Sequence, residues 1–181
     1  MTLPDYAIHV CSNDDGPPAE AEQLFKEELA DSRRDKPNAD KWRFVNICAL
    51  SGSDKVLGGL HMDVGPIEFG PLADERLAYL EHLFVRPEYR NHGIATVLLN
   101  RATDEALSRG CNHIRFNVSW NNPAAIAVCR KSGFALTCLE DGGYFVMKPT
   151  SQSRAVPDHG YGLRLVMKNP KPMMCHAEGF L

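Results

Sequence analysis

A turn between an expected strand and an expected helix carries the first residues suited to chemistry. Arg90 and the residues Asn91 to Ala95 (NHGIA) follow the apolar run 80–85 and precede a helical stripe of apolar residues. The first N–H groups of a helix have no partner within it, and the helix dipole favours negative charge there. Gly93 lets a phosphate approach the backbone, and Arg90 adds positive charge. The turn therefore predicts a phosphate site, although ligand-free turns of this pattern occur in many α/β proteins.

Glu81 is the second such residue, since it lies within the apolar run LEHLFV at 80–85. A carboxylate in an apolar strand is costly to bury without a partner or a purpose. It could act as a general base towards an amine, because an alkylammonium with a pKa of about 10 is mostly charged at neutral pH. A structural salt bridge is the alternative. His82 is a weaker candidate, since it points to the opposite face of the strand.

A second helix with clear ends is expected at residues 122–134 (NPAAIAVCRKSGF). Asn122 suits its N-cap, Pro123 its first position and Gly133 its end. This helix and the turn at 90–95 together resemble two motifs of the GCN5-related N-acetyltransferase (GNAT) family, R/Q-x-x-G-x-G/A and N-x-x-A-I-x-x-Y-x-K-x-G-F. The two motifs occur in the family's order with a strand between them. The chain departs at one position, where Cys129 replaces the Tyr.

The resemblance implies the GNAT fold, an α/β (α+β) architecture. A mixed, mostly antiparallel seven-stranded sheet is flanked by about four helices, and strands 4 and 5 splay apart to admit acetyl-CoA. The cofactor's phosphates would lie on the turn, and its amide-containing arm would pair with the strand edge at 83–85. Asn122 matches a family position that contacts the cofactor, although its N-cap role explains it equally well. The expected cofactor-binding residues are Leu83, Phe84, Val85, Arg90, Asn91, His92, Gly93, Ile94, Ala95, Thr96 and Asn122.

Two catalytic residues, Glu81 and Cys129, follow from the same resemblance. Glu81 stands in an L-E-x-x-x-V pattern similar to that of aminoglycoside-acetylating members, where the carboxylate holds or deprotonates the amine. Many members use a Tyr at the position of Cys129 as general acid to the CoA thiolate. A thiol with a pKa of about 8.5 could replace it, but it is shorter, and a small buried residue is the alternative.

These residues predict direct transfer of an acetyl group from acetyl-CoA to a primary amine of a small molecule. An aminoglycoside antibiotic or a polyamine is the first expectation, which would make the protein an antibiotic-resistance enzyme in the former case. A protein or peptide N-acetyltransferase and a CoA-binding regulator without turnover remain open. Acidic residues in the expected acceptor segments favour a cationic substrate; they are Asp14, Asp15, Glu68, Asp74, Glu75, Glu140 and Asp141.

Composition limits the other classes of function. The 181 residues carry a net charge of -3, which argues against general binding to nucleic acid or to an anionic membrane. We find no transmembrane run and no secretory signal, so a cytoplasmic location is expected. Six single cysteines without a CxxC pair predict free thiols and no structural metal. We expect one domain at 1–168 and an extension at 169–181. The extension and the exposed strand edges are compatible with a homodimer.

Several elements must position these residues. The apolar pattern predicts strands at 5–11, 42–50, 55–64, 80–85, 112–119 and 134–139, and helices at 17–33 and from 94 to a terminal Gly110. The helical stripe of the latter takes residues 94, 97, 98, 102 and 106. Gly58-Gly59 predicts a bend or bulge. For the last strand of the sheet we favour 162–168, with 143–148 as an extension, and the reverse assignment is the alternative.

Overall fold

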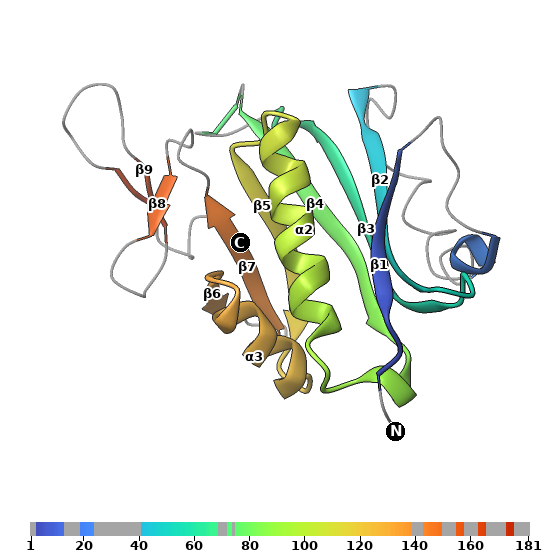
Figure 1. Ribbon diagram of the computed structural model, residues 1–181. Helices are drawn as coiled ribbons and strands as arrows, with labels where there is room; N and C mark the ends of the chain where they lie inside the picture. The colour runs from blue at the N-terminus through green and yellow to red at the C-terminus, as the bar shows by residue number, and fades with distance from the viewer. Residues whose placement is uncertain are drawn as a thin grey trace. The chain divides into compact units, whose positions relative to one another are not determined.

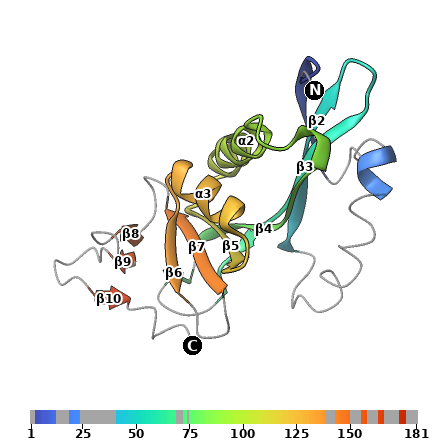
Figure 2. The ribbon, with the colours of Figure 1, turned by 90° about the horizontal axis from the view of Figure 1, so that it is seen from below.

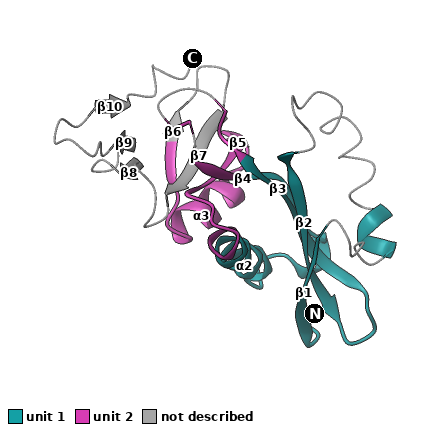
Figure 3. Cartoon of the chain, turned by 90° about the horizontal axis from the view of Figure 1, so that it is seen from above, with its two compact units in different colours: residues 1–65, 79–105 teal, residues 66–78, 106–181 magenta. Residues whose placement is uncertain are grey.

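The computed structural model describes residues 3–12, 19–23, 41–68, 72–73, 75–138, 143–149, 155–157, 163–165 and 173–175 (Figure 1). The chain divides into two compact units (Figure 3). Unit 1 comprises Met1–Gly65 and Tyr79–Glu105, and unit 2 comprises Pro66–Ala78 and Ala106–Leu181.

The secondary structure matches the expected fold class. The strands are β1 Tyr6–Ser12, β2 Arg43–Ser51, β3 Val56–Pro66, β4 Arg76–Val85, β5 His113–Ser119, β6 Ala135–Cys138, β7 Gly143–Pro149, β8 Ala155–Pro157, β9 Leu163–Leu165 and β10 Met173–Cys175. The helices described over their full length are the 3-10 helix η2 Pro87–Tyr89, α2 Ile94–Ser108 and α3 Pro123–Lys131. Seven strands form one sheet in the order β1-β2-β3-β4-β5-β7-β6, and β10-β9-β8 form a second sheet that was not expected.

In unit 1, β2 and β3 form an antiparallel hairpin with a bulge. Ala49 lies opposite Gly58 and Leu50 opposite Val56, so Leu57 has no partner on β2. The bulge expected at the glycine pair is confirmed, and it places Val56 and Gly58 on opposite faces. Val56 belongs to a buried cluster with Ala21, Cys48 and Leu50, against which Phe84 packs. A Cβ at Gly58 would instead face Val85 and Ile94.

Helix α2 follows the turn after β4 and ends as expected. Gly110 has a φ of 72°, its N–H donates to the Leu107 carbonyl, and the Cys111 N–H donates to the Ala106 carbonyl. This is the Schellman pattern, in which a residue with positive φ closes a helix. The buried stripe differs from the prediction at one position, because Val97 is 37% exposed and Leu99 is buried in its place.

In unit 2, β7 lies between β5 and β6 and pairs with both in antiparallel fashion. The favoured assignment of 162–168 as the last strand of the large sheet is therefore wrong, and 143–149 takes that place. Residues 163–165 pair with β8 and β10 instead. The short connection from β6 to β7 explains this, since consecutive strands usually pair locally as a hairpin.

Helix α3 has both of the ends that the sequence predicts, and Figure 2 shows it beside β6. The Asn122 Oδ1 accepts a hydrogen bond from the Ala125 N–H at 3.0 Å, with Pro123 in the first turn. Gly133 has a φ of 78°, and the Phe134 N–H donates to the Cys129 carbonyl at 3.1 Å. Asn122 therefore acts as the N-cap in this structure.

The helix expected at 17–33 is described only in part. Residues 19–23 are helical, and Ala21 is fully buried. The remainder of that prediction lies outside the described residues. Among the helices that are described, none is long and apolar enough to cross a membrane.

Candidate functional site

The turn between η2 and α2 has the geometry of an anion cradle. Asn91 and Gly93 adopt positive φ values of 64° and 83°, and the Val97 N–H makes the first helical bond, to the Gly93 carbonyl at 3.1 Å. Among the backbone hydrogen bonds of the described chain, none has an N–H of residues 91–96 as its donor. A Cβ at Gly93 would meet no atom within 4 Å, so the space at that position is open. Such a run of N–H groups binds anions.

Arg90 ties this turn to the end of β4. Its Nε donates to the Val85 carbonyl at 3.0 Å, while the residue remains exposed. The His92 Nδ1 lies 2.7 Å from the Arg90 carbonyl, which only accepts, so Nδ1 carries the proton of this hydrogen bond. Both contacts hold the turn in shape and leave the positive charge of Arg90 beside the N–H groups of residues 91–96.

Val85 presents its backbone polar groups away from β3. The Arg86 N–H donates to the Leu57 carbonyl of β3 at 3.0 Å, and the Phe84 carbonyl lies over Gly58 of β3. Because a trans peptide places its N–H and C=O on opposite sides, the Val85 C=O and N–H point the other way. This is the orientation that a strand-like ligand needs in order to pair with Val85.

Glu81 and His82 lie on opposite faces of β4, as the two-residue period requires. The His82 ring lies 5.8 Å from the Phe84 ring, on the face that packs against the Ala21 cluster. Glu81 is half-buried and shares the other face with Val85. It therefore lies on the same strand as Val85 and four residues before it, about 13 Å along an extended chain.

Cys129 lies in α3, in unit 2. Its side chain is 2% exposed, and burial raises the pKa of its thiol to about 11. A buried neutral thiol is a weak proton donor at neutral pH. These observations favour the packing role for Cys129, and its role as an acid stays a prediction.

The acidic residues expected to attract a cationic acceptor have different outcomes. Glu75 is buried in unit 2, where its carboxylate hydrogen-bonds the Nε2 of the fully buried His113, so it does not face solvent as expected. Glu68 is exposed. Asp14, Asp15, Asp74, Glu140 and Asp141 lie outside the described residues. Within the part of the chain that the structure describes, no three His, Cys, Asp or Glu residues are grouped to hold a metal ion.

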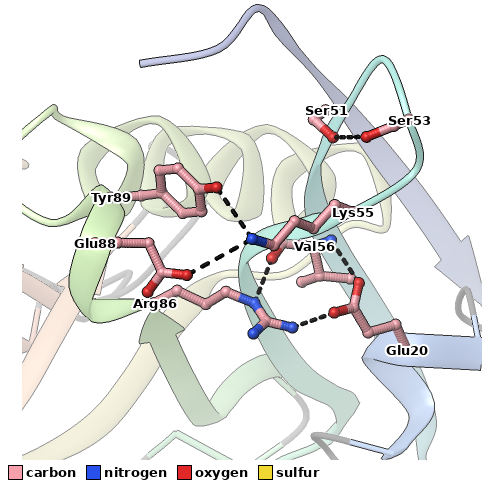
Figure 4. Close-up of polar contacts among 8 residues, drawn as sticks. All are labelled: Glu20, Ser51, Ser53, Lys55, Val56, Arg86, Glu88 and Tyr89. Atoms are coloured by element: carbon pink, nitrogen blue, oxygen red, sulfur yellow. Dashed lines mark hydrogen bonds and ion pairs between the residues drawn. The ribbon is translucent and has the colours of Figure 1, made fainter. Parts of the chain in front are cut away.

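A polar network around the start of β3 was not expected from the sequence (Figure 4). Glu20 and Arg86 both bond to the backbone of Val56. Beside them, the Lys55 Nζ donates to the Tyr89 hydroxyl at 3.2 Å and lies 3.7 Å from the Glu88 carboxylate. The only local signal for this network is an Arg directly before a Pro at the end of a strand, because the partners lie 30 to 36 residues apart in sequence.

Comparison with known proteins gives the family. The model described as "Acetyltransferase (GNAT) family" matches residues 13–134. Thialysine N-epsilon-acetyltransferase of Bos taurus is 40% identical over 50 residues, which make up 27% of this chain and 29% of that protein. The match thus spans less than a third of that relative's length.

Solved structures agree with the fold. NAA60 of Arabidopsis thaliana in complex with acetyl-CoA is similar with a TM-score of 0.58 and 15% identity, over 79% of this chain and 98% of that chain. The spermidine N-acetyltransferase SpeG from Vibrio cholerae gives a TM-score of 0.53 and 16% identity, over 78% of this chain and 93% of that one.

Proposed function

Because the chain belongs to the acetyltransferase (GNAT) family, we propose that it transfers the acetyl group of acetyl-CoA to a primary amine of a small molecule. The observation that carries the proposal is the turn at residues 91–96. Among the backbone hydrogen bonds of the described residues none uses its N–H groups as donors, and the neighbouring Arg90 is exposed, so donors and a positive charge remain for a pyrophosphate.

The residues present fit acetyl-CoA, because its phosphates and its amide-containing arm would each have a counterpart. The N–H groups of residues 91–96, together with the Thr96 hydroxyl and the Arg90 charge, would hold the phosphates. The backbone at 83–85 would pair with the amides of the arm, because Val85 directs both of its polar groups away from β3. Asn122 remains a further proposed contact, beside its observed N-cap role. When bound, acetyl-CoA supplies an activated acetyl group as a thioester.

Glu81 would act as the general base. The acceptor amine enters as an ammonium ion, and only its neutral form has the lone pair needed for attack. Glu81 would take that proton from its place on the strand that holds the arm. General bases contribute roughly 10²- to 10⁴-fold to a rate, so this residue should carry a large share of the turnover.

The acceptor class is proposed as a small primary amine, with a polyamine or an aminoglycoside first. The names of the two similar proteins, a thialysine N-epsilon-acetyltransferase and a spermidine N-acetyltransferase, both denote amine acceptors. The half-buried Glu81 would contribute negative charge beside such an acceptor. Cys129 is proposed to pack rather than to act as an acid.

Thiol release from acetyl-CoA, followed with a chromogenic disulfide, tests the proposal against a panel of amines. The panel should hold polyamines, aminoglycosides, thialysine, amino acids and basic peptides, with a reaction lacking amine as the background. We expect turnover with one class of small amine. Turnover with basic peptides alone would instead make the protein a peptide acetyltransferase. Tight acetyl-CoA binding without turnover on any of these amines would contradict the proposal and favour the regulator.

A further inference from the structure

Two segments far from Val56 in the sequence, those of Glu20 and Arg86, meet at Val56, next to the bulge of β3 (Figure 4). The Arg86 Nε donates to the Val56 carbonyl at 2.6 Å, and the Arg86 N–H donates to the Leu57 carbonyl at 3.0 Å. The Glu20 Oε2 accepts from the Val56 N–H at 2.8 Å, and its Oε1 pairs with the Arg86 guanidinium. Both polar backbone groups of the buried Val56 are thus bonded by these two side chains.

The bulge explains why these contacts are needed. Leu57 has no partner on β2, so the regular ladder between β2 and β3 is interrupted beside Val56. Buried backbone groups need hydrogen-bond partners, and Arg86 supplies one to each of two consecutive carbonyls, through its backbone and through its side chain. The peptide between Val85 and Arg86 is therefore held in one plane against β3.

Holding that peptide decides where Val85 points. The C=O of Val85 belongs to the same planar unit as the Arg86 N–H, so it is directed away from β3 for as long as Arg86 stays on Leu57. There it accepts from the Arg90 Nε at 3.0 Å. A rotation of the peptide at Arg86 would turn the Val85 carbonyl and weaken this contact.

We propose that Arg86, oriented by Glu20, is a positioning residue for the pantetheine arm of acetyl-CoA. This inference rests on the proposed function, because it assigns the pairing of the arm to the Val85 backbone. The Arg86 side chain is 26% exposed and that of Glu20 is 41% exposed, so their ion pair contributes little to global stability. The ion pair instead orients the Arg86 side chain, because the Glu20 carboxylate fixes the guanidinium while its Nε donates to the Val56 carbonyl.

The guanidinium is required for this role. It presents several N–H donors in a rigid plane, so one group bonds the Val56 carbonyl while another bonds Glu20. The ammonium of a lysine is a compact charge that cannot reproduce this fixed two-sided geometry. Arg86→Lys should thus keep the charge and lose part of the positioning, and Arg86→Gln should lose both.

Calorimetric titration of two ligands separates positioning from a general structural effect. One ligand is acetyl-CoA, and the other is the nucleotide fragment of CoA that ends at the pyrophosphate and lacks the arm. We expect Arg86→Gln to weaken acetyl-CoA about tenfold, which corresponds to one or two lost hydrogen bonds, and to leave the fragment within about twofold. The acetyl-CoA affinity of Arg86→Lys should lie between those of the wild type and Arg86→Gln. Glu20→Gln should also weaken acetyl-CoA binding, because it removes the charge that orients the guanidinium.

A matched ion pair provides the control. Arg101 and Glu105 pair at 2.7 Å on α2, in the same unit, as an i,i+4 pair within the helix. Arg101→Gln should change neither affinity. Equal losses of both ligands in the Arg86 variants would overturn the inference in favour of a general disturbance, and unchanged acetyl-CoA affinity would overturn it outright. If the wild-type protein bound neither ligand, the proposed function itself would fail.

Discussion

Replacement of Gly58 by alanine should disturb the arm site from the neighbouring strand. A Cβ built at Gly58 lies 2.8 Å from the Phe84 carbonyl oxygen and 3.3 Å from atoms of both Val85 and Ile94. Ordinary van der Waals contact begins at about 3.4 Å, so the carbonyl would have to move by roughly 0.6 Å. Because the carbonyl is backbone and both neighbours are packed side chains, the new methyl group has no flexible atom to displace.

The size of the effect follows from the planarity of the peptide. A shift of the Phe84 carbonyl carries the Val85 N–H with it, and a displacement of about 0.6 Å exceeds the spread of about 0.5 Å over which N–H···O distances normally fall, so the donor would no longer fit the arm. One or two lost bonds to the arm are worth about 0.5 to 3 kcal/mol, or roughly a twofold to 150-fold weaker acetyl-CoA affinity. Overpacking should also lower the free energy of unfolding by about 1 to 3 kcal/mol.

Calorimetric titration with acetyl-CoA, beside denaturant unfolding of the same samples, measures both quantities. Gly52→Ala is the matched control, because a Cβ there meets no atom within 4 Å and the residue lies in the β2–β3 hairpin loop. We expect it to leave affinity and stability unchanged. If Gly58→Ala bound acetyl-CoA as tightly as the wild type, the pairing of the arm with the end of β4 would be refuted.

The remaining predictions concern three residues. Glu81→Gln should lower kcat/KM by roughly 10²-fold or more, because the amine would lose its base, with acetyl-CoA affinity unchanged. Gly93→Val should weaken CoA binding, since a side chain would enter the open space at that position and a φ of 83° strains a β-branched residue. Cys129→Ala should cost little turnover. Burial raises the pKa of this thiol from 9.0 to about 11, so its stabilising contribution is complete below pH 9 and is lost as the pH rises towards 11. The alkaline fall in the free energy of unfolding should therefore be shallower in Cys129→Ala.

Each of these has an outcome that would count against it. Wild-type turnover of Glu81→Gln across pH 6 to 9, measured in steady state, would remove the carboxylate from the role of base. If calorimetry showed that Gly93→Val binds CoA as tightly as the wild type, the turn would not be the phosphate site. A loss of turnover above roughly 10²-fold in Cys129→Ala would restore the thiol as an acid.

Local signals in the sequence predicted how α2 ends and where α3 begins and ends. Asn122, Gly110 and Gly133 act through bonds that span only a few residues, so their types and spacing are enough to place them. The strand-turn-helix at the phosphate turn is equally local. The family, with its fold, followed from two such segments in the right order.

Contacts between distant segments could not be predicted in this way. The sequence favoured 162–168 over 143–148 as the last strand, because both are short and apolar, and the pairing of 143–149 with β5 and β6 overturned that preference. Glu75 is expected from the sequence among the acidic residues that favour a cationic acceptor, but it is buried against His113, which lies 38 positions away. The role that we propose for Arg86 could not be predicted from the sequence either, because it depends on distant partners, namely Glu20 and the bulge at Leu57.

The stoichiometry of transfer tests the central claim most directly. Purified protein would be incubated with acetyl-CoA and the preferred amine, and the released thiol would be counted beside the acetylated amine by mass spectrometry. We predict one acetyl group gained by the amine for each thiol released, with both reduced in parallel in Glu81→Gln. Thiol release without acetylated amine would show hydrolysis instead, and it would contradict the account of this protein as an amine acetyltransferase.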